Sequence, residues 1–373
     1  MTHQHPTTSR HRLGKILWIS TFAFDLPLVI LIATFFYISS PRWDEADYDN
    51  TITYNHPPGP DNPDILRVAT YNLGYLSGMT NQQAVVRDRG RLETNQGKAI
   101  AALQPQNLDV LALQEVDFDA YRSFHLNQQY ALSSALALPF AALAVNWDKR
   151  YVPFPYWPPQ AHYRAVTSGQ AVLSRYPIRR NHRLVLERVP TNPFYYNALY
   201  LDRVAQMMEL DLSGQPLMVM NVHLEAFDAP TRLRQTAVVR QLAEQYAETM
   251  PVVLLGDFNS DLDRAEERAT GEMPSIQTLL DSPVLASASP VEAQSATFPS
   301  DQPQYSLDYI FYTPATLAVR DWQIITTAAQ ASDHLPMMAT LERLPDGAHS
   351  ESQPTQVKTS PNPPLPTQDN HRP

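Results

Sequence analysis

The sequence contains no cysteine, which excludes disulfides, thiol nucleophiles and zinc sites built from thiolates. Basic residues are also few, with 28 Lys and Arg against 38 Asp and Glu and a net charge of -10. The chain as a whole therefore lacks the basic field that attracts nucleic acid, which leaves only a local basic groove for such a ligand. Glycine is scarce, with 11 residues against 33 prolines, so we expect rigid turns and disordered ends.

One long apolar run is present near the N-terminus, over residues 16–38, and its only charged residue is Asp25. As a helix this run would be roughly 34 Å long, enough to cross a hydrocarbon layer of about 30 Å. We expect a transmembrane helix, because the run is long for a core helix or a secretory signal and no small-residue cleavage site follows Ser39. Asp25 and Pro27 lie near its middle and predict a kink or a polar partner.

The charges that flank the run predict its orientation. Basic residues precede it and acidic residues follow it, which indicates a short cytoplasmic N-terminus over residues 1–15. The protein is then a single-pass membrane protein whose main domain lies on the extracytoplasmic side. Residues 39–64 are rich in Pro and Asp and are predicted to be a linker. The main domain is expected over residues 65–344, and residues 345–373 are expected to be a disordered tail.

The chain has 373 residues. Its middle part alternates short β-type runs with helical stretches, which is typical of one large α/β domain. Helices are predicted near residues 93–103 and from Asp228, with Pro230 in the first turn of the second. Runs such as residues 110–113 and 252–255 are apolar without alternation, which favours a layered sandwich of strands buried on both faces over a barrel. The predicted strands are 66–72, 108–115, 170–175, 203–212, 216–224, 251–257, 307–313, 320–327 and 336–342.

Polar residues stand at the ends of several of these runs. Asn72 and Glu115 end the first two, and an amide and a carboxylate that project together can bind a hard cation such as Mg²⁺. Glu115 is the expected main metal ligand, although a strand-end acid by itself is more often simply exposed. Asp257 and Asn259 follow another buried run and could orient a water and bind a phosphate oxygen. An Asx turn is the equally weighted alternative.

Two histidines occupy similar positions. His223 ends a predicted strand, and His334 follows Asp333 just before the last one. Imidazole titrates near neutral pH, so two histidines can divide acid and base work, and Asp308 is the natural partner for one of them. A lone histidine is more often a surface or core residue than a catalytic one. The polar neighbours of these two favour a catalytic role.

The motifs TYNLG, LALQEVD, GQAVLSRYP, NVHLE, LLGDFNS, SLDYIF and SDHLP occur in this order. Over about residues 66–343 the chain thereby resembles the endonuclease/exonuclease/phosphatase superfamily, the deoxyribonuclease I-like fold. The resemblance implies the α/β (α+β) class, as a four-layer α/β sandwich of two packed mixed β-sheets flanked by helices. It also implies a site at the strand ends where water attacks a phosphoester with the help of a divalent metal.

The resemblance assigns roles residue by residue. His334 resembles the general base, held by Asp308, and His223 resembles the histidine that assists the phosphate or the leaving group. Asp257 and Asn259 look like the pair that orients water and phosphate. The implied metal ligands are Glu115, Asn72 and Asp333, for Mg²⁺ or alternatively Mn²⁺ or Ca²⁺. The implied substrate-binding residues are Asn72, Asn259, Gln170 and Arg203. Gln170 departs from the Asn of many relatives, and Arg203 could equally be a surface cation.

The expected function is that of a membrane-anchored, divalent-metal-dependent phosphoester hydrolase, either a phosphodiesterase or endonuclease-like. A phospholipid head-group phosphodiesterase of sphingomyelinase type is the alternative, and a non-catalytic binding module on the same fold is the alternative of another class. The partner is thus a nucleic acid or a phospholipid head group, with no obligate protein partner inferred. Two segments are left open: the arginines of residues 87–91 could clamp an anion or only solvate a loop, and the aromatics of 146–165 could meet a membrane, stack on bases or pack.

Overall fold

The computed structural model describes residues 25–61, 63–81, 83–263, 273–290 and 295–345. The predicted cytoplasmic N-terminus, residues 16–24 of the predicted membrane helix and the predicted tail after residue 345 lie outside the described residues.

The described strands form two mixed sheets. The seven-stranded sheet has the order β1 (Thr51–Thr53), β4 (Phe140–Val152), β5 (Arg164–Ser174), β3 (Val110–Asp117), β2 (Ile65–Asn72), β13 (Met337–Arg343), β12 (Leu317–Ile324). The six-stranded sheet has the order β10 (Ala286–Ser287), β11 (Asp308–Tyr312), β9 (Val252–Asp257), β8 (Gln215–His223), β7 (Val204–Leu212), β6 (Ile178–Val185). Each sheet contains a parallel pair, β2 with β3 and β8 with β9, among antiparallel neighbours.

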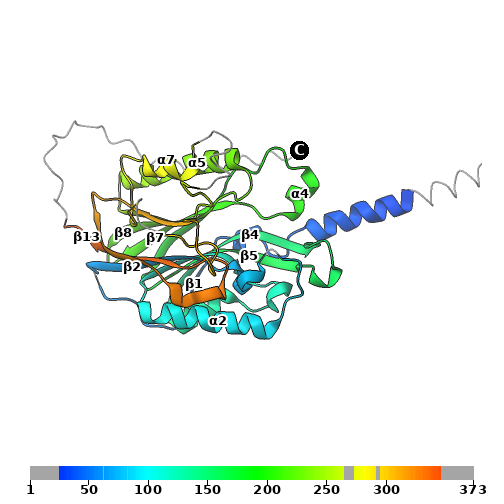
Figure 1. The fold of residues 1–373 in the computed structure, drawn as a ribbon, viewed down its shortest axis with the longest axis horizontal. Helices are drawn as coiled ribbons and strands as arrows, with labels where there is room; N and C mark the ends of the chain where they lie inside the picture. Colours follow the sequence, from blue (N-terminus) through cyan, green and yellow to red (C-terminus); the bar gives the residue numbers. More distant parts are fainter. Residues whose placement is uncertain (1–24, 62, 82, 264–272, 291–294, 346–373) are drawn as a thin grey trace, which may run out of the picture.

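Helices cover the outer faces of the two sheets. Figure 1 shows α2 along one sheet, with α5 and α7 along the other. The α-helices of the domain include α2 (Arg89–Leu103), α3 (Gln128–Leu136), α4 (Phe194–Leu199), α5 (Ala229–Ala247) and α7 (Ser275–Leu280). The order of layers is therefore helix, sheet, sheet, helix, and the prediction of two packed mixed sheets flanked by helices is confirmed.

Three apolar clusters hold these layers together. In β2, Val68 packs in the cluster between the sheets, whereas its neighbour Ala69 packs in the cluster beneath α2. A third cluster joins the other sheet to α5 and α7. Because successive residues of a strand face opposite sides, a strand between two cores is apolar at consecutive positions. This explains why the predicted strands showed no alternation.

Each predicted strand coincides with an observed one, but β1, β4, β6 and β10 were not predicted. The sequence of β6 (IRRNHRLV) is mostly polar, and β4 contains the polar stretch NWDKR. Both pair along most of their length, β4 with β5 and β6 with β7. Backbone pairing therefore stabilises these strands where the side-chain pattern gives no signal.

Residues 39–64, which we expected to be a linker without ordered structure, make specific contacts with the domain. β1 pairs with β4, and the side chains of Trp43 and Tyr48 pack against the core. The backbone N–H groups of Arg42 and Trp43 both donate to Asp148 Oδ2, at 2.8 Å each. This segment is thus joined to the domain by specific contacts.

A helix over residues 25–39 precedes this segment and projects from the domain (Figure 1). Within the described part of the chain, no helix combines the length and the apolar character needed to cross a membrane. The prediction of a membrane helix over residues 16–38 therefore stays a prediction.

Gly256 lies inside β9 with φ +145°. A Cβ atom there would lie 2.0 Å from the carbonyl oxygen of Val222 on the parallel neighbour β8. We expect Gly256→Ala to lower the free energy of unfolding by about 3 kcal/mol or more, through strain and overpacking, as measured by urea unfolding. Gly97→Ala in α2 is the control, because a Cβ atom at position 97 would meet no atom within 4 Å, and it should raise stability by roughly 0.5–1 kcal/mol. Equal stability of the two variants would contradict this account.

Candidate active site

The two parallel strand pairs end at the same place, one in each sheet. Asn72 ends β2 and Glu115 lies near the end of β3, while His223 ends β8 and Asp257 ends β9. Asn72 Nδ2 donates to Asp257 Oδ2 at 2.8 Å and so joins the two sheets. Residues that are far apart in the sequence therefore converge where the parallel strands end.

Glu115 is presented by an irregularity in β3. The pairing of β3 with β5 shifts register between Leu113 and Val116, and Glu115 has φ +51°, a conformation that costs free energy for a residue with a side chain. Bulges of this kind redirect side chains next to active sites. Asn81 Nδ2 donates to Glu115 Oε2 at 2.9 Å and holds the carboxylate in place.

Asp257 and Asn259 form a local turn and belong to the site at the same time. Asp257 Oδ1 accepts from the backbone N–H of Asn259 at 2.9 Å. Asn259 has φ +52°, and its Nδ2 donates to the carbonyl oxygen of Leu224 at 3.0 Å. The Asx turn and the functional site are therefore not alternatives here, since the turn positions both side chains.

His334 and Asp308 are in direct contact. His334 Nδ1 lies 2.8 Å from Asp308 Oδ2, which also accepts from Thr297 Oγ1 at 2.6 Å. Asp308 pairs with Asp257 across β11 and β9, and His334 Nε2 lies 3.8 Å from Asp257 Oδ2. The carboxylate of Asp308 thus orients the imidazole so that its other nitrogen faces the remaining site residues.

Burial and confined negative charge shift several pKa values in the site. Burial, with the charge of Asp333, raises the pKa of Glu115 to about 7. Burial also raises the pKa of Asp257 to about 6, against the opposing effect of His334. For His334, burial lowers the pKa, but Asp308 and Asp257 outweigh it and raise the pKa to about 10. Burial is thus the main cause for the two carboxylates, whereas neighbouring carboxylates are the cause for His334.

His223 lies in a different electrostatic environment. Its Nε2 is 3.5 Å from Asp257 Oδ2 and 3.9 Å from Glu115 Oε1. Burial, together with the charges of Arg203 and His334, holds the pKa of His223 well below its usual value. The two histidines therefore differ in protonation behaviour: without a bound cation, the charged form is favoured at His334 and the neutral form at His223.

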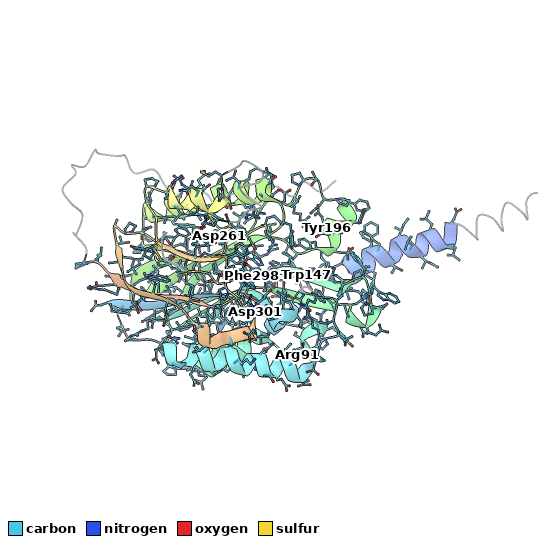
Figure 2. The ribbon with its side chains drawn as sticks, viewed as in Figure 1. Arg91, Trp147, Tyr196, Asp261, Phe298 and Asp301 are labelled. Carbon is cyan, nitrogen blue, oxygen red and sulfur yellow. The ribbon has the colours of Figure 1, made fainter. Side chains whose placement is uncertain are left out.

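One cavity of about 660 Å³ contains this cluster, a volume in the range of ligand-binding pockets. Its polar floor is formed by Asn72, Asn81, Glu115, Arg203, His223, Asp257, Asn259, Asp333 and His334. Its wall is largely aromatic, formed by Phe35, Tyr75, Trp147, Phe154, Tyr156, Tyr163, Tyr195, Tyr196, Tyr200, Phe227 and Phe298. Figure 2 shows Trp147 and Phe298 in the middle of the domain and Tyr196 on the side from which the N-terminal helix projects.

The donor set fits a hard divalent cation. Asn81 Nδ2 donates to Glu115 and also lies 3.2 Å from Asp333 Oδ2, so two carboxylates flank one amide. Asn72 adds an amide oxygen on the same floor, and oxygen ligands of this kind suit Mg²⁺. Asp257, Asp308 and His334 form a second group whose ligand atoms lie within 4.8 Å. Because its imidazole Nδ1 faces Asp308, His334 would offer Nε2, which lies 3.8 Å from Asp257 Oδ2, to a cation there.

The structure does not bring every predicted residue into the cavity. Gln170 is fully buried between the sheets, and its Nε2 donates to the carbonyl oxygen of Asn221 at 3.0 Å. Asp308 lies behind His334 and reaches the cavity only through it. Arg203 does line the cavity, with its Nε 3.5 Å from Glu225 Oε2. Its Nη1 has no hydrogen-bond partner among the described residues.

The arginines after Asn72 do not clamp the site. Arg87 Nη1 donates to the carbonyl oxygen of Thr80 at 3.0 Å, and Arg89 pairs with Glu93 on the surface of α2. Arg91 belongs to the first turn of α2 (Figure 2) and is not among the residues that line the cavity. Arg89 thus agrees with the alternative of a solvated segment, whereas Arg87 agrees with neither alternative, because its guanidinium carbon also lies 5.7 Å from the ring centroid of Tyr163 in the cavity wall.

Asn81, Tyr75 and Arg122 are site residues that the sequence analysis missed. Arg122 is buried, and its guanidinium carbon lies 3.5 Å from the ring centroid of Tyr75 and 4.9 Å from that of Trp147. Its Nη2 lies 2.8 Å from Asp117 Oδ1. A cation that stacks on several rings and pairs with a buried carboxylate holds the aromatic wall in place. Only the LQEVD motif next to Asp117 could have drawn attention to it.

Arg122→Met should lower the free energy of unfolding by about 3–5 kcal/mol, because it leaves the buried carboxylate of Asp117 without its cation. Urea unfolding followed by circular dichroism measures this change. Arg89→Met is the control, since its ion pair with Glu93 is exposed and is worth less than about 1 kcal/mol. A small effect of Arg122→Met would show that the pair does not support the cavity wall.

Comparisons with known proteins agree with this architecture. The family model for the Endonuclease/Exonuclease/phosphatase family matches residues 69–334. No curated protein sequence gave a significant match. A solved endonuclease/exonuclease/phosphatase from Beutenbergia cavernae DSM 12333 is similar, with a TM-score of 0.55 and 21% identity over 75% of this chain and 72% of that one. Another, from Bacteroides vulgatus, has a TM-score of 0.52 and 17% identity over 76% of this chain and 100% of that one. With the matched residues spanning most of the chain and both sheets of the site, the protein belongs to the Endonuclease/Exonuclease/phosphatase family.

Proposed function

We propose that the protein is a membrane-anchored, divalent-metal-dependent phosphoester hydrolase of the phosphodiesterase type. The observation that carries the proposal is the shared cavity. Its floor combines carboxylates, amides, an arginine and two histidines that come from both sheets. Such a floor can hold a cation, an anionic phosphate group and a water molecule together.

The side chains divide the chemical work. Arg203 and the amides of Asn72 and Asn259 provide positive charge and N–H groups for phosphate oxygens. Asp257, held by Asn72 and by the backbone of Asn259, can accept a hydrogen bond from a water molecule. His334, oriented by Asp308, would take the proton of that water in its neutral form, which a cation bound nearby would favour by offsetting the charges of the neighbouring carboxylates. His223 lies on the opposite sheet, and we assign it to assist the leaving oxygen.

Glu115, Asp333 and Asn72 would hold the cation, and Mg²⁺ is the ion that we propose, with Mn²⁺ or Ca²⁺ as alternatives. A cation bound there polarises a phosphoryl oxygen and lowers the pKa of bound water. The amide of Asn81, which lies 2.9 Å from Glu115 Oε2 and 3.2 Å from Asp333 Oδ2, supports the assignment, because it shows that the two carboxylates face one point.

Membrane anchoring through residues 16–38 is part of the proposal. It is supported by the apolar sequence and by the exposed apolar side chains of its described portion, such as Leu31 and Phe36, each 65% exposed. The basic residues before the run favour a cytoplasmic N-terminus and an extracytoplasmic catalytic domain.

Removal of divalent cations provides the direct test. The full-length protein in detergent should hydrolyse a soluble phosphodiester such as bis(p-nitrophenyl) phosphate in Mg²⁺. EDTA should abolish this activity, and excess Mg²⁺ should restore it, because the site supplies ligands for the cation but no substitute for its charge. The release of p-nitrophenol measures the rate. Hydrolysis that persists in EDTA would contradict the metal-dependent proposal.

A further inference from the structure

Five aromatic side chains are exposed at the mouth of the active-site cavity. They are Tyr156, Trp157, Phe194, Tyr195 and Phe227, with exposed fractions between 57% and 76%. Tyr156, Tyr195 and Phe227 also line the cavity, and the other two are their chain neighbours. We call these five residues the aromatic collar. Large exposed apolar side chains gathered at a cavity mouth indicate an interaction surface.

The helix over residues 25–39 meets the aromatic collar directly. Phe35 lines the cavity, and its ring centroid lies 5.9 Å from that of Phe194. Figure 1 shows α4, which begins at Phe194, beside the base of this helix. The end of the helix is held as well, because Arg150 Nε donates to Ser40 Oγ at 3.0 Å and Arg42 Nη1 donates to the carbonyl oxygen of Asp119 at 2.7 Å. The helix therefore has a defined position relative to the cavity mouth.

Exposed apolar side chains lie on all sides of this helix, which indicates that lipid rather than a protein groove surrounds it. The five consecutive residues 28–32 are Leu, Val, Ile, Leu and Ile, with exposed fractions between 47% and 65%. Consecutive residues of an α-helix point about 100° apart, so these five cover its whole circumference. A protein groove covers one face of a helix, whereas lipid chains surround it completely. Residues 16–24 continue the apolar sequence without a charge.

We propose that the aromatic collar and the helix over residues 25–39 seat the mouth of the active-site cavity on a lipid bilayer, so that the cavity receives a phosphoester carried by a membrane lipid. The identity of the reacting group rests on the proposed function, whereas the docking surface stands on the exposed residues alone. Phe35 lies only three residues after Ile32, about 4.5 Å along a helix axis. The cavity mouth is thus at the level of the membrane interface, where Trp and Tyr side chains are favoured.

The cavity itself suits a lipid phosphoester better than a nucleic acid. Part of the aromatic wall, including Phe35 of the helix and Tyr196, lies on the helix side (Figure 2) and can contact the apolar part of a lipid. The phosphate would then reach the polar floor. The arginines of the cavity, Arg122 and Arg203, lie beside Asp117 and Glu225, respectively. The wall therefore offers little of the unbalanced positive charge on which nucleic acid binding depends.

Single cysteines test the docking surface, because the natural sequence has none. Full-length Trp157→Cys and Phe194→Cys, each labelled with an environment-sensitive fluorophore, are reconstituted into phosphatidylcholine vesicles. Val238→Cys in α5 is the matched control, since Val238 is 42% exposed and lies outside the cavity wall. We expect the emission at positions 157 and 194 to shift to shorter wavelength and to be quenched by nitroxide-labelled lipids, and the emission at position 238 to do neither.

Two outcomes would overturn the proposal. In the first, the labels at 157 and 194 report the same aqueous environment as the label at 238. In the second, the labels at 157 and 194 are as shielded from water in detergent as they are in vesicles, and the protein has the mass of a dimer. This result would mean that a second copy of the chain covers the aromatic collar.

A separate activity measurement distinguishes this proposal from the proposed function. The double variant Trp157→Ser/Phe194→Ser should lose at least about tenfold of its activity on sphingomyelin or phosphatidylcholine vesicles, because two apolar side chains no longer enter the interface. Its activity on soluble bis(p-nitrophenyl) phosphate should stay unchanged. If the wild-type protein hydrolyses neither substrate, the proposed function fails, while the fluorophores still report whether the surface docks. If the wild-type protein hydrolyses the soluble substrate but not vesicle lipid, the lipid substrate is excluded.

Discussion

Replacement of His334 by Ala should lower the rate of phosphodiester hydrolysis by at least about 10²-fold. The imidazole of His334 is oriented by the carboxylate of Asp308, whose Oδ2 lies 2.8 Å from Nδ1. Its Nε2 faces Asp257, which we propose to orient the attacking water. Without the imidazole, the site loses the group that we propose to take the proton of that water. The initial rate with bis(p-nitrophenyl) phosphate in saturating Mg²⁺ measures the effect.

Two further variants separate catalysis from folding. His334→Asn retains an N–H group that can donate to Asp308, so it should remain folded and be nearly as inactive as His334→Ala. His182→Ala is the control. His182 is partly exposed and lies in β6, opposite Met207 of β7, so its replacement should leave the rate unchanged. Circular dichroism and the Tm control for unfolding. Undiminished turnover in folded His334→Ala would remove His334 from the mechanism.

Replacement of Glu115 by Gln should have a comparable effect on rate, at least about 10²-fold, together with weaker cation binding. The substitution keeps the size of the side chain and removes its charge. Asn81 holds the carboxylate of Glu115 by a hydrogen bond, at a position where β3 departs from regular pairing. The backbone conformation and the hydrogen bond therefore fix the carboxylate in the cavity. Loss of its charge leaves Asp333 as the main anionic ligand.

Cation binding by this variant can be measured without turnover. A ligand that binds the folded state raises the Tm, so Mg²⁺ should raise the Tm of the wild-type protein more than that of Glu115→Gln. Electron paramagnetic resonance of Mn²⁺ gives the affinity directly. Glu93→Gln, an exposed substitution on α2, is the control and should behave as the wild type. Equal affinity of Glu115→Gln and the wild type for Mn²⁺ would exclude Glu115 as a ligand.

Local patterns predicted the strands of the core and the residues at their ends. Val68 and Ala69 pack into different cores, and such strands are apolar at consecutive positions, which a sequence shows directly. The polar residue that ends such a run, for example Asn72 or Asp257, is equally visible. The family motifs supplied the roles, because the chemistry of one carboxylate or one histidine is not specific by itself.

Other residues depended on contacts that local patterns do not contain. Gln170 lies within β5, and its side chain points between the sheets, because the facing of a strand residue depends on the register and on the packing of the second sheet. Asn81 gave no signal, since its function arises from two carboxylates that are distant in the sequence. Arg122 is a charged residue buried through its pairing with Asp117, whereas the default expectation for an arginine is exposure.

The sequence alone determined the class of fold, the positions of the core strands and the kinds of side chain available for chemistry, because side-chain periodicity and burial are properties of short segments. Only the tertiary structure decided that the ends of the two parallel strand pairs share one cavity, as the hydrogen bond from Asn72 to Asp257 shows. It also decided that an aromatic wall connects this cavity to the N-terminal helix through Phe35. Both depend on how two sheets and a helix pack against one another, and such long-range contacts leave no pattern in any single segment.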